Sequence, residues 1–227
     1  YAGGAINSGG IILRWLRDGM LTAERDRALA QEIDPYGTII ELAGSVPPGA
    51  EGLLFLPYLF GERTPYWNPF ARGVIFGLAP HHTKAHLARA TVEGISMCIA
   101  HILELLADSP GGITEIRASG GFARSDKWVQ ILADILGKKI SLPQVHESSA
   151  MGAIILGMKA VGQIKSLSSA REMISVNKVF EPDLKKHQIY QERFVMFKEL
   201  YKHIEPDFAR WAQIQGQMPK EFPPEFA

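Results

Sequence analysis

The stretch ITEIRASGGFARSDKWVQILADILG, residues 113–137, decides the expected fold. Residues 113–119 predict a strand, and Gly120 and Gly121 predict a sharp turn after it. Ser125 predicts the cap of a helix, which carries apolar side chains at helical spacing and ends at the final glycine. A strand that passes through a glycine turn into a helix is typical of layered α/β domains.

Strand and helix signals alternate along the rest of the chain. Short runs bounded by glycine or proline predict strands at residues 52–56 and 138–142. Apolar and small residues predict helices after Thr83 and over residues 148–162 and 184–204. This alternation favours an α/β fold.

The predicted domain covers residues 1–204, and we expect an irregular tail over residues 205–227. Four prolines in that tail argue against a regular element. The chain of 227 residues is 46% hydrophobic, which is enough to bury a sizeable core. It enters a glycine-rich stretch at once and without an initiator methionine, so we expect a piece of a longer chain with a truncated start.

The overall charge excludes some classes of partner. Lysine plus arginine and aspartate plus glutamate both number 24, so no net field attracts the chain to nucleic acid or to an anionic membrane. Cys98 is the only cysteine, which excludes an intrachain disulfide and fits a reducing compartment. No signal peptide and no uninterrupted apolar stretch of membrane-spanning length is apparent. We therefore expect a cytoplasmic protein without nucleic-acid or membrane partners.

Two junctions between glycines and helices are the candidate ligand sites. Gly120 and Gly121 precede one helix, and Gly9 and Gly10 precede another. Such turns let a backbone approach a ligand closely and direct unpaired N–H groups at it, which suits a nucleotide. Glycines at these positions are also often only structural, although two such junctions in one chain strengthen the ligand hypothesis. Neither a dinucleotide-binding Gly-x-Gly-x-x-Gly motif nor a P-loop lysine motif is present.

Two further groups of polar residues have competing interpretations. His81, His82 and His86 suggest a metal, but solvated histidines are favoured because the spacing lacks a zinc-protease pattern. No metal ligand is therefore assigned. Glu62 and Arg63 are either an active-site pair or a surface ion pair, and both interpretations stay open at this point.

Several longer motifs together resemble the FGGY family of carbohydrate kinases. GVIFGL at residues 73–78, followed after a spacer by HLARATVE at residues 86–93, is similar to the family signature throughout. GERTP at residues 61–65 and SGGFARS at residues 119–125 resemble the family's conserved loop and adenosine motif. GAINSGGIILRWLRD at residues 4–18 is more similar to gluconate kinases than to xylulose or glycerol kinases.

This resemblance implies a fold of two actin-like, ribonuclease-H-like domains, of which this chain resembles the second. It implies binding of ATP and Mg²⁺ and transfer of the γ-phosphoryl group to a hydroxyl of a sugar or sugar acid. By motif, Gly120, Gly121 and Ser125 match adenosine-contacting positions. Gly10 and Arg14 match positions beside the nucleotide.

The resemblance also implies that essential parts lie outside this chain. The general-base aspartate, the sugar pocket and the phosphate loops of the family precede the second domain, so no catalytic residue is expected here. Phosphoryl transfer needs stabilisation from several sides at once, and we expect the isolated chain to be inactive. The expected partners are a small sugar or sugar acid and the protein's own amino-terminal domain, with a homodimer as an open alternative.

The leading hypothesis for function is a kinase that converts gluconate to 6-phosphogluconate. One alternative is a kinase for xylulose or another pentulose. Another, of a different class, is a nucleotide-binding or interaction module on the same fold that has lost catalysis.

Overall fold

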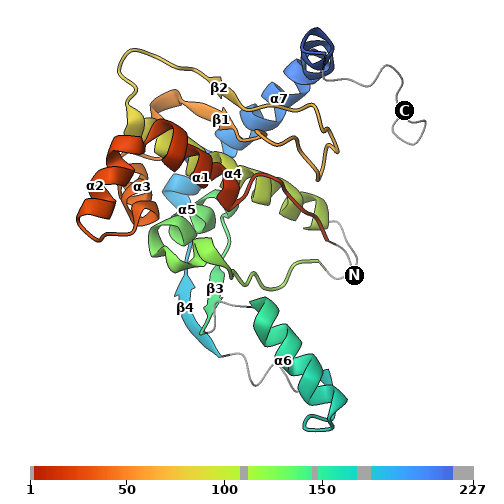
Figure 1. Ribbon diagram of the computed structural model, residues 1–227. Coiled ribbons are helices and arrows are strands. Elements are labelled where there is room, and N and C mark those ends of the chain that lie inside the picture. Colours follow the sequence, from red (N-terminus) through yellow and green to blue (C-terminus); the bar gives the residue numbers. More distant parts are fainter. Residues whose placement is uncertain (1–2, 108–111, 145–147, 168–174, 217–227) are drawn as a thin grey trace.

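The computed structural model describes residues 3–107, 112–144, 148–167 and 175–216 (Figure 1). Its helices are α1 (Gly10–Trp15), which continues as a π-helical turn (Leu16–Met20), α2 (Thr22–Ala30), α3 (Pro35–Gly44), α4 (Lys84–Ala107), α5 (Asp126–Leu136), α6 (Ser148–Ala160) and α7 (Leu184–Ile214). Its strands are β1 (Leu54–Leu56), β2 (Val74–Phe76), β3 (Ile140–Pro143) and β4 (Val176–Phe180). Short 3₁₀ turns occupy Ala50–Gly52 and Gly121–Arg124.

Helix α4 is the central element of the fold, and α3, α5 and β1 pack against it (Figure 1). By length and composition alone α4 is apolar enough to cross a membrane, which the sequence analysis did not anticipate. However, 56% of its most apolar window is buried inside the protein. Ile95 and Cys98 belong to the main hydrophobic core. Helix α4 is therefore placed as the core helix of a globular domain.

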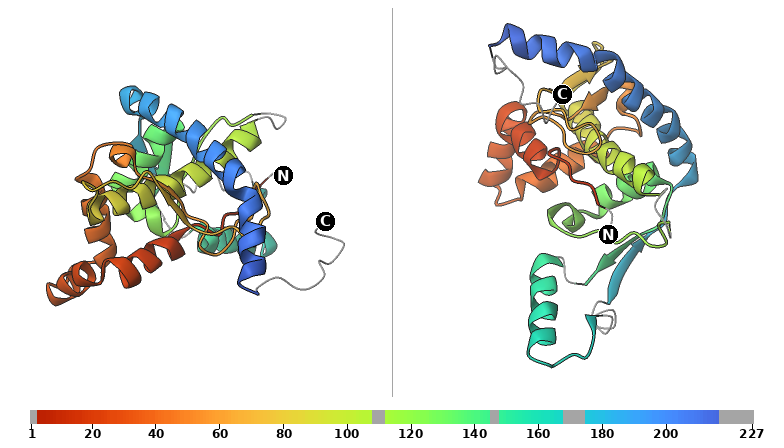
Figure 2. Two further views of the ribbon diagram at one scale, coloured as in Figure 1. Left: turned by 90° about the horizontal axis from the view of Figure 1, so that it is seen from above. Right: turned by 90° about the vertical axis from the view of Figure 1, so that its right-hand side faces the viewer.

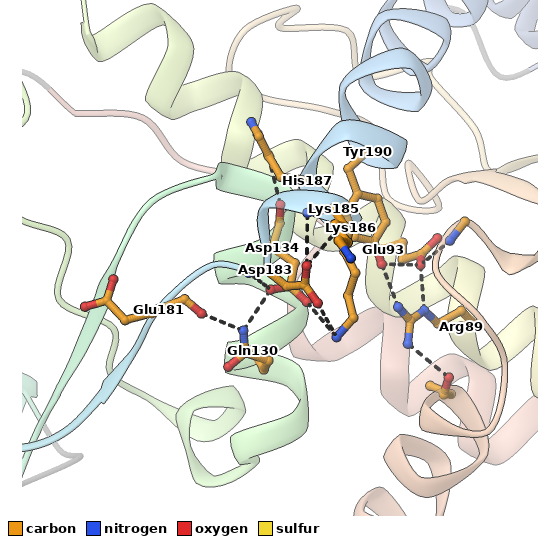
Figure 3. A network of polar contacts seen from close by, with 12 residues as sticks. Arg89, Glu93, Gln130, Asp134, Glu181, Asp183, Lys185, Lys186, His187 and Tyr190 are labelled. Atoms are coloured by element: carbon orange, nitrogen blue, oxygen red, sulfur yellow. Dashed lines mark hydrogen bonds and ion pairs between the residues drawn. The ribbon is translucent and has the colours of Figure 1, made fainter.

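A buried polar cluster fastens three segments to α4 (Figure 3). Arg89 Nε donates to Glu93 Oε1 over 2.5 Å, and the same oxygen accepts from Tyr190 Oη at 2.7 Å and from Gly49 N at 2.9 Å. The other Arg89 nitrogens donate to Tyr190 Oη and to the Ala43 carbonyl at the end of α3. We call this group the Arg89–Glu93–Tyr190 cluster. It joins α3, the loop before β1 and α7 to one turn of α4.

A second polar group joins α5 to the start of α7 (Figure 3). Asp134 is only 2% exposed, and its Oδ1 accepts from Gln130 Nε2 at 2.7 Å and from Asp183 N at 2.9 Å. Lys186 Nζ lies 3.6 Å from the other carboxylate oxygen. A buried carboxylate requires such partners, so the contacts fix the first turn of α7 against α5.

The sheets are small and antiparallel. β1 pairs with β2, with Leu54 opposite Phe76, and β3 pairs with β4. The predicted strand at residues 113–119 is wrong as a regular strand, because it forms a single bridge, Arg117 to Ser141, beside β3. β4 was not predicted, since most of its residues are exposed and lack the alternation of a half-buried strand.

Figure 2 shows the β3–β4 pair extending away from the helices and carrying α6 at its far end. The helix at residues 148–162 was expected, and α6 begins at Ser148 and ends at Ala160. Ile154 and Leu156 on α6 are 56% and 60% exposed. Helix α6 therefore leaves much of its apolar surface exposed within the described part of the chain.

Helix α7 corrects the expected irregular tail. It begins at Leu184 as predicted but continues through Pro206 to Ile214, so the expectation is wrong for residues 205–214. Residues 217–227 lie outside the described residues. A proline removes one helical hydrogen bond. Phe208, two residues after Pro206, is only 7% exposed and packs in the main core. Burial of that ring offsets the cost of the proline.

We predict that Tyr190→Phe destabilises the protein. The change removes one hydrogen bond from buried Arg89 and one from buried Glu93, which should lower the free energy of unfolding by about 1–3 kcal/mol. Tyr66→Phe is the matched control, because the Tyr66 hydroxyl is buried without a partner in the described structure and should cost less than about 0.5 kcal/mol. Equal denaturation midpoints for the two variants would contradict the role given to the cluster.

Candidate functional site

The turn before α5 has the conformation that a close approach of ligand requires. Gly120 has φ 93° and ψ −172°, a region that only glycine adopts without strain, whereas Gly121 begins the 3₁₀ turn with a negative φ. Ser125 Oγ then accepts from Trp128 N at 3.3 Å and caps α5, as predicted. No hydrogen bond within the described part of the chain uses the backbone N–H of Gly121 or Phe122.

The surface of this turn is open. A Cβ atom added to Gly120 or Gly121 would meet no protein atom within 4 Å. A small apolar cluster supports the turn from beneath, formed by Ala118, Ala123, Val129, Leu132, Ala133, Ile140 and Leu142. Trp128 anchors it to α4, because its indole N–H donates to Ser96 Oγ at 3.2 Å. The turn is thus a firm surface with space above it, which suits a flat ligand such as a nucleoside.

The second candidate turn leads into α1. Gly10 and Arg14 are four residues apart on the exposed face of this helix, while Ile12, Leu13 and Leu16 are buried on the other. Arg14 forms no ion pair within the described residues. In the described structure it is therefore a cation without an ion-pair partner on the same face of α1 as Gly10, which could attract phosphate oxygens.

The segment before α1 is held by the loop at residues 57–68, which we call the GERTP loop. Ala5 N donates to Thr64 Oγ1 at 3.1 Å, and Thr64 N donates to the Ala5 carbonyl at 3.0 Å. Asn7 Nδ2 donates to the Phe60 carbonyl at 3.2 Å. The loop and the segment are far apart in the sequence, so the family motif in the loop sets the path of the chain into α1.

Glu62 is a buried member of the GERTP loop that sequence reasoning left unresolved. It is only 3% exposed, and burial raises the pKa of its carboxyl to about 7. Ser8, immediately before Gly9, lies against it, with its Oγ 3.2 Å from Glu62 Oε2. The sequence did not single out Ser8, although it stands within the predicted glycine-rich stretch.

The surface ion-pair interpretation of Glu62 and Arg63 is wrong. The Arg63 guanidinium lies over the Trp67 ring, 5.5 Å from its centroid. Only the backbone N–H of Arg63 reaches the carboxyl, donating to Glu62 Oε1 at 2.9 Å. Within the described part of the chain, the buried Glu62 carboxyl consequently has no ion-pair partner.

Two of the three histidines, His82 and His86, connect the residues before β1 to the start of α4. His86 Nε2 lies 2.9 Å from Glu51 Oε2, and His82 Nε2 lies 3.3 Å from the Glu51 carbonyl. Among the residues that the structure describes, no group of three or more His, Cys, Asp or Glu side chains is arranged to hold a metal.

The structure places the predicted site residues on two turns rather than in one cluster. Gly120, Gly121 and Ser125 lie at the start of α5, and Gly10 and Arg14 lie on α1. Both helices pack against α4, and no hydrogen bond within the described residues joins the two turns directly. A ligand that reaches both must therefore bridge two separate elements.

Comparison with known proteins gives consistent results. A family model for the carboxy-terminal domain of the FGGY family of carbohydrate kinases matches residues 1–161. Gluconokinase from Bacillus licheniformis is 40% identical over 217 residues, which are 95% of this chain and 42% of that protein. This chain thus spans about two fifths of the length of that relative.

Two solved structures extend the similarity to three dimensions. Gluconate kinase from Lactobacillus acidophilus superposes with a TM-score of 0.81 at 30% identity, covering 92% of this chain and 40% of that one. A ligand-bound xylulose kinase from the same organism superposes with a TM-score of 0.80 at 31% identity, also covering 92% and 40%.

The two glycines of the α5 turn should differ in their effect on stability. Gly120→Ala places a Cβ atom on a backbone conformation reserved for glycine and should cost about 1–3 kcal/mol in the free energy of unfolding. Gly121→Ala meets open space at an ordinary φ and should change that free energy by less than about 0.5 kcal/mol. Chemical denaturation of both variants checks this. A larger loss for Gly121→Ala would mean that the conformation of the turn is assigned to the wrong residue.

Proposed function

The chain belongs to the FGGY family of carbohydrate kinases, and from this premise we propose that the protein phosphorylates gluconate with ATP, giving 6-phosphogluconate. The actin-like α/β fold predicted from the motifs is the fold of the family's second domain, and the resemblance to the family is confirmed. The observation that carries the choice of gluconate is the similarity to gluconokinase along almost the whole chain.

In this proposal the described domain supplies one wall of the nucleotide site. The open turn at Gly120 and Gly121 receives the adenosine, with Ser125 holding the start of α5 in place. Gly10 and Arg14 face the phosphates. Within the described residues the backbone N–H groups of Gly121 and Phe122 have no hydrogen-bond partner and the Arg14 guanidinium has no ion-pair partner, so they can supply donors of the kind that such a ligand needs.

The other parts of the reaction belong to the rest of the protein. The general base, the sugar pocket and the Mg²⁺ ligands are assigned to the amino-terminal domain, which is also the proposed partner of this chain. ATP supplies the phosphoryl group when bound, and the residues described here bind and orient it. Alone, this chain is expected to show no sugar-dependent turnover. A cytoplasmic location completes the proposal.

A xylulose or related pentulose kinase is the second candidate. It is favoured by the superposition on xylulose kinase, which is as close as that on gluconate kinase. Sugar contacts lie mostly outside this chain, so the substrate must be decided with the longer protein.

A substrate panel on the full-length protein, coupled to ADP release, tests the proposal. We expect gluconate to give a kcat/KM at least about tenfold above that for xylulose, ribulose or glycerol, since a site built to pair a carboxylate rejects analogues that lack it. Higher kcat/KM for a pentulose would support the second candidate. Full-length protein that binds ATP but phosphorylates none of them would favour a module that has lost catalysis.

A further inference from the structure

Trp128, in the first turn of α5, makes three contacts that the proposed function does not use. Its backbone N–H donates to Ser125 Oγ at 3.3 Å, and its indole N–H donates to Ser96 Oγ at 3.2 Å. Phe122 lies edge-on to its ring, with the two ring centroids 5.6 Å apart. Because Phe122 follows Gly121 directly, this one residue contacts both the 3₁₀ turn and the cap of α5.

The hydroxyl of Ser96 is arranged to accept from the indole. Ser96 is fully buried on α4, and its Oγ donates its only proton to the Val92 carbonyl at 2.8 Å. The lone pairs of that oxygen are therefore left for a donor. The indole N–H of Trp128 can only donate, and Trp128 is 5% exposed, so this N–H needs an acceptor inside the protein. Ser96 supplies it.

This hydrogen bond is the directional part of the contact between Trp128 and α4. Trp128 belongs to the main hydrophobic core, where apolar contacts set no particular direction. A hydrogen bond weakens steeply as its angle departs from linear, so Ser96 fixes the orientation of the indole. Phe122 packs against both the main core and the small cluster beneath the turn. A shift of the indole is therefore passed through Phe122 to the backbone N–H groups of Gly121 and Phe122.

We propose that Ser96 and Trp128 are positioning residues for nucleotide binding: their buried hydrogen bond holds the α5 turn in the conformation that receives the adenosine. The inference rests on the proposed function, because it assigns the adenosine to that turn. Neither residue touches the ligand. Ser96 lies inside the protein on α4, and Trp128 acts through Phe122 and Ser125. Backbone donors that shift lose affinity, since a hydrogen bond depends on distance and angle.

Calorimetric titration of the full-length protein with ADP tests this inference. Ser96→Ala leaves the indole N–H without an acceptor and frees the ring to turn, so the Kd for ADP should rise about three- to tenfold.

Thr91→Val is the matched control. Thr91 is also fully buried on α4, and its hydroxyl donates to the Leu87 carbonyl at 2.8 Å. No hydrogen bond of its side chain within the described residues reaches α5. Thr91→Val should therefore leave the Kd for ADP unchanged within about twofold.

A double-mutant cycle tests whether the two side chains act through their hydrogen bond. Trp128→Phe keeps an aromatic ring and removes the indole N–H. If the bond carries the effect, adding Ser96→Ala to Trp128→Phe should raise the Kd for ADP by less than about a further twofold. An effect of Ser96→Ala that is equally large in both backgrounds would overturn the inference, because Ser96 would then not act through Trp128.

Steady-state kinetics separate positioning from a general loss of structure. Positioning of the adenosine predicts that Ser96→Ala raises the KM for ATP and leaves kcat and the KM for the sugar nearly unchanged. A variant that spoils both substrates alike would show a merely structural role and overturn the inference. Thermal melting checks that each variant is folded. If Ser96→Ala fails to fold, Trp128→Phe decides the matter by the same comparison of the two KM values.

Two outcomes distinguish the inference from the proposed function. A folded Ser96→Ala protein with the Kd of the unaltered protein for ADP would overturn the inference and leave the proposed function intact. Unaltered full-length protein that binds no ADP would overturn the proposed function and the inference with it.

Discussion

The buried ion pair between Arg89 and Glu93 is the interaction on which the other elements depend. A buried carboxylate and guanidinium are stable only when their remaining hydrogen-bonding groups are satisfied. Here the partners come from the end of α3, from Gly49 before β1 and from Tyr190 on α7. Because no single element provides them all, the charge pair is satisfied only when these segments meet at α4. Arg89 and Glu93 both lie in the family signature, so this part of the signature also determines how the elements pack.

The candidate site depends on this arrangement indirectly, through helix α4. Helix α4 presents Ser96 to Trp128, which anchors the α5 turn, and its apolar side packs beneath α1. The GERTP loop follows β1, which also packs on α4, and holds the segment before Gly10. The α5 turn and the entry to α1, which are distant in the sequence, are therefore both positioned by helix α4. A site made of backbone groups needs such support, because small shifts of the chain move the donors themselves.

Local chemistry was predictable from the sequence, and tertiary context was not. The Ser125 cap and the glycine end of α5 follow from hydrogen bonds within a few residues, and both were predicted. The stretch at residues 113–119 lies beside β3, but only Ile116 and Ala118 exchange hydrogen bonds with Ser141, so it forms one bridge and not a regular strand. Pro206 was expected to end the helix, but α7 continues because Phe208 and Ala212 beyond it are buried. The burial of Glu62, which raises the pKa of its carboxyl, is a tertiary property that no local pattern predicts.

The claim that the α5 turn forms a wall of the nucleotide site is tested most directly by Gly121→Val in the full-length enzyme. No protein atom lies within 4 Å of the added Cβ position, so valine should interfere with the ligand and not with folding. The account predicts a KM for ATP raised about tenfold or more, with the KM for the sugar and the Tm nearly unchanged. Gly157→Val on α6, where the space is equally open, should change neither KM. A well-folded Gly121→Val enzyme with an unchanged KM for ATP would contradict the account.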